Sequence, residues 1–112
     1  MQNHFAAEQT SPAVFPELRP FLNERGQLIR FPAKRRKKLL ALYYLGEKLE
    51  ADRTYTEAQI NALLDDWTAF HDPATLRREM YNAGLLNRTP DGRSYWKAEE
   101  LPVLEVFLRD RL

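Results

Sequence analysis

Five consecutive cations near the start of the chain could bind an anion. They stand directly before an apolar run typical of a helix: Lys34, Arg35, Arg36, Lys37 and Lys38. A helix N-terminus offers a phosphate free backbone N–H groups and partial positive charge, and these side chains would add to both. Five consecutive helical residues turn through about 400°, so several of the five reach solvent whichever face is buried. The alternative is a solvated helix start whose lysine stems cover the edge of the core.

A second group of polar and cationic side chains lies on a later predicted helix and on the hairpin that follows it. If Leu76 faces inward, the outer arc of that helix carries Arg77, Arg78, Tyr81 and Asn82. Arginine can bond guanine and asparagine can bond adenine in the major groove, so these four are candidates for base readout. Arg88 and Arg93 on the hairpin would hold flanking phosphates.

The same residues also have structural interpretations. Arg77 and Arg78 could pair with acids of the preceding helix, such as Asp65 and Asp66. The rings of Tyr95 and Trp96 could stack on bases, but aromatic pairs on short hairpins usually pack in the core, and we favour that interpretation.

No residue is assigned a catalytic or metal-binding role. The chain contains no cysteine, and its two histidines are His4 and His71, whereas a zinc site needs three or four convergent ligands. No serine has the context of a nucleophile elbow, and there is no glycine-rich phosphate loop. We therefore expect no cofactor, no metal and no enzymatic activity.

Size and composition predict one domain. The chain has 112 residues, is 44% hydrophobic and carries thirteen aromatic rings (six Phe, five Tyr, two Trp), enough for a compact core. The net charge of +1 hides a segregation, because residues 30–38 hold six cations and no acid while residues 47–66 hold six acids against two cations. No apolar run reaches the ~18 residues of a membrane span, and no signal-peptide pattern is present. The expected location is the cytoplasm, with no membrane partner.

The front of the chain is predicted to be irregular. Residues 1–15 lack a sustained apolar period and are expected to form a mobile arm. Residues 16–23 are predicted to form a short helix or an extended strap. A turn at Gly26 is then followed by a short strand ending at Pro32, in which Leu28 and Ile29 are buried.

Three helices are predicted next. The first covers residues 33–49, with one inward stripe made of Leu39, Leu42, Tyr43, Gly46 and Leu49. The second starts at Thr56, which forms a capping box with Gln59. The third has Asp72 as its N-cap and Pro73 at its first position, and stops where Gly84 can adopt the left-handed conformation.

A hairpin and a final helix complete the expected order. Residues 90–92, Pro-Asp-Gly, are typical of a turn between two strands. Residues 101–112 show another helical stripe, which Val103 and Val106 widen. That helix would either fold back over the body of the monomer or meet a second copy in a homodimer.

These elements predict an α+β fold: a small winged-helix-like domain of three helices and a two-stranded wing hairpin, with an added C-terminal helix, over residues 16–112. In that arrangement the third helix packs against the second and the hairpin forms the wing. A small α+β bundle could combine the same elements in another packing.

Several motifs are similar to those of the bacterial domain-of-unknown-function family DUF2087. The resemblance covers roughly residues 21–97, and its motifs are Pro-Ala-Lys-Arg at 32–35, Tyr-Thr-Glu at 55–57, Leu-Arg-Arg-Glu at 76–79, Gly-Leu-Leu at 84–86, and Asp-Gly before Tyr-Trp at 91–96. In that family the domain occurs alone or behind a helix-turn-helix regulator domain. The resemblance therefore implies a link to transcription, without an established activity.

Two functions are consistent with these patterns. The first is a DNA-binding transcriptional regulator that places its third helix in the major groove of double-stranded DNA and its basic helix start and wing on phosphates. The second is a non-enzymatic protein-interaction or dimerisation module, which the near-neutral total charge favours. No pattern argues for a particular small-molecule ligand.

Overall fold

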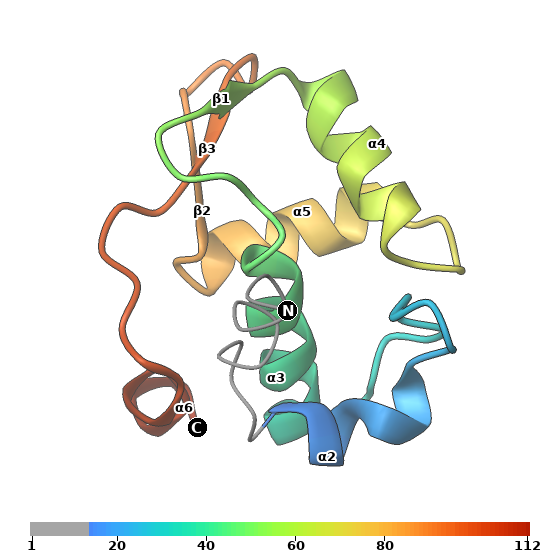
Figure 1. Cartoon of the computed structure of the whole chain (residues 1–112). Coiled ribbons are helices and arrows are strands. Elements are labelled where there is room, and N and C mark those ends of the chain that lie inside the picture. Colours follow the sequence, from blue (N-terminus) through green and yellow to red (C-terminus); the bar gives the residue numbers. More distant parts are fainter. Residues whose placement is uncertain (1–13) are drawn as a thin grey trace, which may run out of the picture.

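The computed structural model describes residues 14–112, so almost all of the arm expected at residues 1–15 lies outside the described part. The fold is α+β (Figure 1). Its elements are α2 (Val14–Leu18), the 3₁₀ turn η1 (Arg19–Phe21), α3 (Arg35–Gly46), β1 (Thr54–Tyr55), α4 (Glu57–Asp66), α5 (Pro73–Asn82), β2 (Leu86–Arg88), β3 (Tyr95–Lys97) and α6 (Leu104–Arg111). The short helix predicted within residues 16–23 is thus present as α2 and η1.

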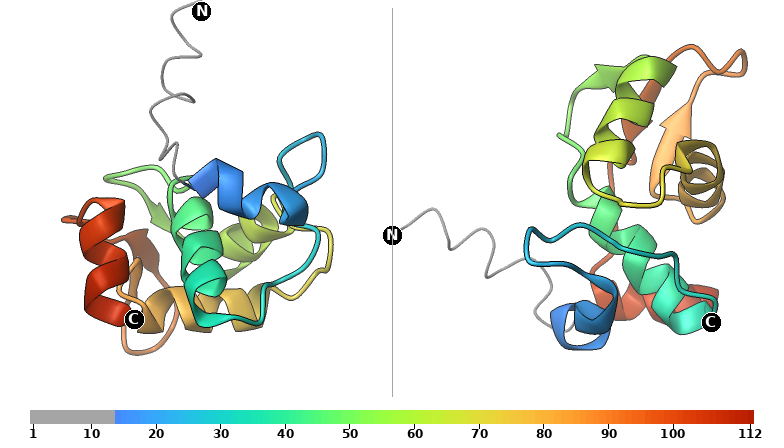
Figure 2. Two further views of the ribbon diagram at one scale, coloured as in Figure 1. Left: turned by 90° about the horizontal axis from the view of Figure 1, so that it is seen from below. Right: turned by 90° about the vertical axis from the view of Figure 1, so that its right-hand side faces the viewer.

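Helix α3 is the centre of the molecule. It is shorter than the predicted 33–49, and every residue from Leu39 to Gly46 is buried. The prediction of a single inward stripe is wrong because α2, α5 and α6 all pack against this helix (Figure 2). A helix that is covered on several sides has no solvent face on which polar residues must recur.

Helices α4 and α5 begin as their capping residues predict. The Thr56 hydroxyl accepts a bond from the Gln59 N–H at 3.1 Å, and the Gln59 side chain accepts one from the Thr56 N–H at 2.9 Å. The Asp72 carboxylate accepts a bond from the Thr75 N–H at 3.4 Å, with Pro73 at the first helical position. Gly84, just past α5, has a φ of +83°, as the predicted helix stop requires.

The sheet has three antiparallel strands in the order β1-β3-β2. The predicted hairpin is confirmed, with Leu86 opposite Lys97 and Arg88 opposite Tyr95. Its loop is closed by the Asp91 carboxylate, which accepts bonds from the Thr89 hydroxyl at 2.6 Å and the Arg93 N–H at 3.0 Å. Strand β1 was not predicted, since it is two residues long and its partner β3 lies forty residues further on.

The strand predicted to end at Pro32 is not formed. Leu28 makes only isolated bridges: its N–H donates to the Trp67 carbonyl at 2.8 Å, and its carbonyl accepts from the Ala69 N–H at 2.9 Å. Leu28 is fully buried in the core, but Ile29 is 39% exposed, so the prediction that both are buried is wrong for Ile29. Consecutive side chains of an extended segment point in opposite directions, and only one of the two can face the core.

Helix α6 folds back onto α3, which is the first of the two predicted alternatives. Leu104, Phe107 and Leu108 are buried, and the Phe107 ring centroid lies 5.1 Å from that of Tyr43. The Tyr43 hydroxyl donates to the Pro102 carbonyl at 2.9 Å. In residues 14–112, no helix is long and apolar enough to cross a bilayer.

Candidate nucleic-acid interface

A groove lies between α5 and the hairpin. It has a volume of about 400 Å³ and is lined by Ala74, Arg77, Arg78, Tyr81, Asn82, Arg88 and Tyr95. The four residues predicted to read bases and one of those predicted to hold phosphate therefore meet in one place. None of the lining residues is acidic, so the groove is electropositive.

Two aromatic rings hold two of these arginines. The Arg88 guanidinium carbon lies 4.9 Å from the centroid of the Tyr81 ring, and that of Arg77 lies 5.7 Å from the centroid of Tyr95. Arg88 also donates to the Thr89 and Pro90 carbonyls at 3.3 and 3.4 Å. Because these contacts already restrict the rotamers of Arg77 and Arg88, less side-chain entropy is lost when an anion binds to them.

Arg77 is directed toward α4. It donates to the Asn61 side chain, lies 3.6 Å from the Glu57 carboxylate, and is only 18% exposed. The alternative that Arg77 pairs with the second helix is therefore the arrangement observed, although Glu57 takes the place of Asp65 and Asp66. Arg77 is poorly placed to reach a base edge.

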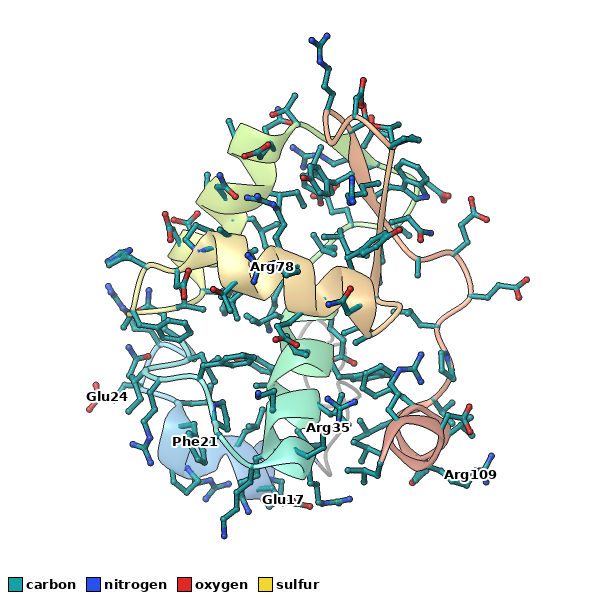
Figure 3. The ribbon with its side chains drawn as sticks, turned by 180° about the vertical axis from the view of Figure 1, so that it is seen from behind. Glu17, Phe21, Glu24, Arg35, Arg78 and Arg109 are labelled. Carbon is teal, nitrogen blue, oxygen red and sulfur yellow. The ribbon has the colours of Figure 1, made fainter. Side chains whose placement is uncertain are left out.

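Arg78 and Asn82 have the opposite environment. Both are exposed, and neither side chain has a hydrogen-bond or ion-pair partner within residues 14–112. Tyr81 is exposed beside them. Figure 3 shows Arg78 on the outer side of α5. Their donors are available to a ligand without the loss of an existing bond.

The five cations at the start of α3 are not equivalent. Arg36 makes two bonds to the Glu17 carboxylate of α2, at 2.8 and 3.0 Å. Arg35 donates to the Arg111 carbonyl at 3.3 Å, and the Lys38 ammonium lies 5.5 Å from the centre of the Phe31 ring. These three side chains are engaged within the chain.

The hydrogen bonds from Arg36 hold the pKa of Glu17 below its usual range, with Coulombic attraction to Arg36 and Lys37 in support. Glu17 is therefore ionised at neutral pH, and it neutralises Arg36. Lys34 and Lys37 line a hollow of about 360 Å³ that also includes Arg30 and no acid, and Lys37 in addition attracts the nearby Glu17 carboxylate.

The start of α3 and the outer side of α5 lie on the same face of the molecule. The right-hand view of Figure 2 places both on one side, and Figure 3 looks onto that face with Arg35 and Arg78 labelled. The far end of α3 adjoins the hairpin, because Gly46 packs against Leu85. The twelve residues of α3 span about 18 Å. Arg93, at the hairpin loop, is 87% exposed.

Sequence reasoning did not identify Arg111. Its Nε donates to the Ala83 carbonyl at the end of α5 at 2.7 Å, and its guanidinium carbon lies 4.2 Å from the Phe107 ring centroid. A cation at a helix C-terminus is favoured by the helix dipole. The only signal in the sequence is a basic residue in the last turn of α6, and nothing local connects it with a helix 28 positions earlier.

The histidines and acidic residues of the described part of the chain form no cluster of metal-ligand type. Residues 14–112 contain no group of three or more His, Cys, Asp or Glu side chains that could hold a metal ion. His71 lies 3.6 Å from Asp65 and is largely exposed in the α4–α5 connection. His4 lies outside the described residues.

Comparison with known proteins assigns the central part of the chain to a family. No curated protein matches the sequence, and no solved structure matches it. A family model described as "Uncharacterized protein conserved in bacteria (DUF2087)" matches residues 27–97, which run from the segment before α3 to the end of β3. Helices α2 and α6 lie outside that match. The chain belongs to the DUF2087 family.

Proposed function

We propose that this protein is a cytoplasmic regulator that binds double-stranded DNA, with α5 in the major groove and the hairpin and the start of α3 on the phosphate backbone. The observation that carries the proposal is the exposed arc of Arg78, Tyr81 and Asn82 beside a groove without acids. To read base edges, a protein needs unpaired hydrogen-bond donors on an element that fits into the major groove. An α-helix is narrow enough to enter this groove.

The order of elements supports a winged helix. A helix, a short strand, two helices and a hairpin follow one another as α3, β1, α4, α5, β2 and β3, and the outer strand β1 pairs with the second hairpin strand. Helices α4 and α5 pack against each other, as the two helices of a helix-turn-helix do. In that arrangement α5 is the recognition helix and the β2–β3 loop is the wing.

The contacts that each side chain makes within the chain suggest its role in DNA binding. Arg78 and Asn82 would read base edges, whereas Arg88, Arg93, Lys34 and Lys37 would hold phosphates. Arg77 and Arg36 would act as supports, because each is held by hydrogen bonds and an ion pair to another helix. Arg93 lies 3.9 Å from the Asp91 carboxylate of its own loop but is 87% exposed.

The proposal is tested by fluorescence anisotropy of a labelled duplex titrated with the protein. A protein that contacts several phosphates should lose affinity by orders of magnitude between about 50 and 200 mM salt. The Lys37→Ala variant should weaken binding to all duplexes and reduce the salt slope by about 1, while Arg78→Ala should relax the sequence preference. Arg109, an exposed cation that points away from α5 on α6 (Figure 3), provides the control variant Arg109→Ala. No binding at low salt, or equal losses in all three variants, contradicts the proposal.

A second candidate function is protein interaction or homodimerisation through α6. Val103 is 64% exposed and Leu112 59% exposed at the two ends of this helix, and the total charge is near neutral. Multi-angle light scattering of the protein and of a Val103→Glu variant tests the homodimer. A dimer that the substitution converts to a monomer supports the interaction role, and a monomer for both variants removes the homodimer.

A further inference from the structure

The groove beside α5 has a different shape from the surface proposed to read DNA. The outer side of α5 is convex, whereas the groove is a hollow lined by residues of α5, by Arg88 of β2 and by the buried Tyr95 of β3. Arg78 and Asn82 belong to both surfaces, because they are exposed on the outer side of α5 and also line the groove. The hollow itself is suited to a smaller occupant.

The chemistry of the lining groups narrows the class of that occupant. Arg78 and Arg88 line the same cavity, and the guanidinium group of arginine binds phosphate with two parallel, charge-assisted bonds. The ring of Tyr81, which is 42% exposed, supplies aromatic surface, on which nucleobases stack without regard to sequence.

The charges around the groove leave a net positive site. Glu57 faces Arg77 at 3.6 Å from the α4 side and balances that guanidinium. No acid pairs with Arg78 or Arg88 within residues 14–112. Two uncompensated cations remain for a phosphate group, which carries up to two negative charges near neutral pH.

The size of the groove is within the range of small-ligand sites. Its volume of about 400 Å³ lies at the lower end of the ~300–1,000 Å³ typical of small-ligand sites. We propose that this groove binds a free nucleoside phosphate, which fills the hollow between α5 and β2 and competes with duplex DNA for Arg78 and Arg88. Competition with the duplex rests on the proposed function, whereas binding of the free nucleotide does not.

Direct binding is measured by isothermal titration calorimetry with 5′-GMP and 5′-AMP, and with guanosine and inorganic phosphate at matched ionic strength. At least one 5′-nucleotide should bind with a Kd below about 1 mM, and guanosine and phosphate should each bind at least about tenfold more weakly, because each lacks one half of the contacts. Equal binding of phosphate and nucleotide overturns the proposal, and so does no nucleotide binding up to about 5 mM.

Variants locate the site. Arg78→Ala and Arg88→Ala should each weaken nucleotide binding about tenfold or more, as the loss of a charge-assisted bond does. Tyr81→Ala should weaken it as well, whereas Tyr81→Phe should leave it unchanged because stacking needs the ring and not the hydroxyl. Arg109→Ala is the charge-matched control, and thermal unfolding shows whether each variant is folded. A nucleotide that binds all of these variants equally lies elsewhere on the protein.

Competition links the groove to DNA. Adding the nucleotide to a complex with a labelled duplex should lower the anisotropy at constant ionic strength, and the Tyr81→Ala variant should be less sensitive to it. A duplex that binds while no nucleotide does overturns the nucleotide site and leaves the proposed DNA-binding function intact. A nucleotide that binds while no duplex does supports the site and removes the DNA-binding function.

Discussion

At the scale of single residues, Arg77 and Arg78 are neighbours with opposite surroundings. A rotation of about 100° per helical residue separates them on α5. Arg77 is carried toward α4, where it meets Asn61, Glu57 and the Tyr95 ring, and Arg78 is carried outward to solvent. Arg77 therefore contributes to stability, while Arg78 is available to a ligand.

Substitutions at the two arginines should separate stability from binding. Arg77→Ala should lower the free energy of unfolding by about 1.5–3 kcal/mol, because the half-buried Asn61 oxygen loses a charged donor. Arg78→Ala should change it by less than about 0.5 kcal/mol, as expected for an exposed side chain without a partner. Urea unfolding measures both, and anisotropy with a labelled duplex should show the larger loss of sequence preference in Arg78→Ala. A stable Arg77→Ala variant would mean that the Arg77–Asn61–Glu57 contacts do not persist in solution.

The Glu17–Arg36 pair should make stability depend on pH in the acid range. The folded pKa of Glu17 lies below its ordinary value of 4.5, so the unfolded chain takes up a proton first as the pH falls. The stabilisation is fully present above about pH 4.5 and is lost as the pH falls below that value toward the folded pKa. Because both side chains are partly exposed, the effect should stay below about 1 kcal/mol.

The Glu17→Gln variant tests this pH dependence. Its free energy of unfolding should be slightly lower than that of the wild type at pH 7 and should converge with it at pH values well below about 4.5. Arg36→Ala should behave in the same way, because it removes the same pair from the other side. Urea unfolding at a series of pH values provides the measurement, and parallel curves for wild type and variants at all pH values would contradict the assigned pair.

At the scale of elements, α3 and α5 each end at or beside a glycine. Gly46 is the last residue of α3, and a Cβ added there would lie 3.7 Å from the Leu85 side chain, an ordinary contact distance. Gly84 follows α5 with a φ of +83°, and an added Cβ would lie 3.1 Å from the Arg111 guanidinium. A side chain would therefore fit at Gly46, whereas one at Gly84 would be strained.

Alanine at the two glycines should have opposite effects. Gly84→Ala should destabilise the protein by about 1–2 kcal/mol, the cost of a left-handed conformation for a residue with a side chain. Gly46→Ala should leave stability unchanged or raise it by up to about 1 kcal/mol, because alanine favours the helix more than glycine does. Thermal unfolding compares the two. A double variant with Arg111→Ala separates the backbone strain at Gly84 from the crowding of Arg111, and an equal loss for both glycine variants would contradict this account.

At the scale of the whole molecule, α6 completes the core although it lies outside the family match. Phe107 is fully buried against Tyr43, Arg111 bonds the end of α5, and Arg35 bonds the end of α6. These contacts join α6 to α3 and to the end of α5.

Removal of the Phe107 ring should destabilise the whole domain. Phe107→Ala should cost about 3–5 kcal/mol, a large part of the ~5–15 kcal/mol available to a domain of this kind. Val103→Ala, at an exposed position one turn before Phe107, should change stability by less than about 0.5 kcal/mol and provides the matched control. Urea unfolding followed by fluorescence measures both variants. Equal stability of the two would mean that α6 is not packed on α3 in solution.

The features that the sequence by itself determined depend on residues a few positions apart. The Thr56–Gln59 capping box, the Asp72 cap, the Gly84 stop and the 90–92 turn each use bonds or backbone conformations within one or two turns of chain. The same local periodicity placed Arg78 and Asn82 on the outer side of α5 and Arg88 on the hairpin. The family could likewise be identified from short motifs.

The tertiary structure decided what depends on partners distant in the sequence. Strand β1 exists only because β3 lies beside it, Leu28 is buried only because residues 67–69 pair with it, and α3 is buried on several sides because helices from both ends of the chain meet there. The structure also separated Arg77 and Arg36, which meet acids of other helices, from Arg78 and Lys37, and joined Tyr81, Arg88 and Tyr95 in one groove. Local patterns cannot specify such pairings, because their energy is set by the packing of surfaces that only the folded chain brings together.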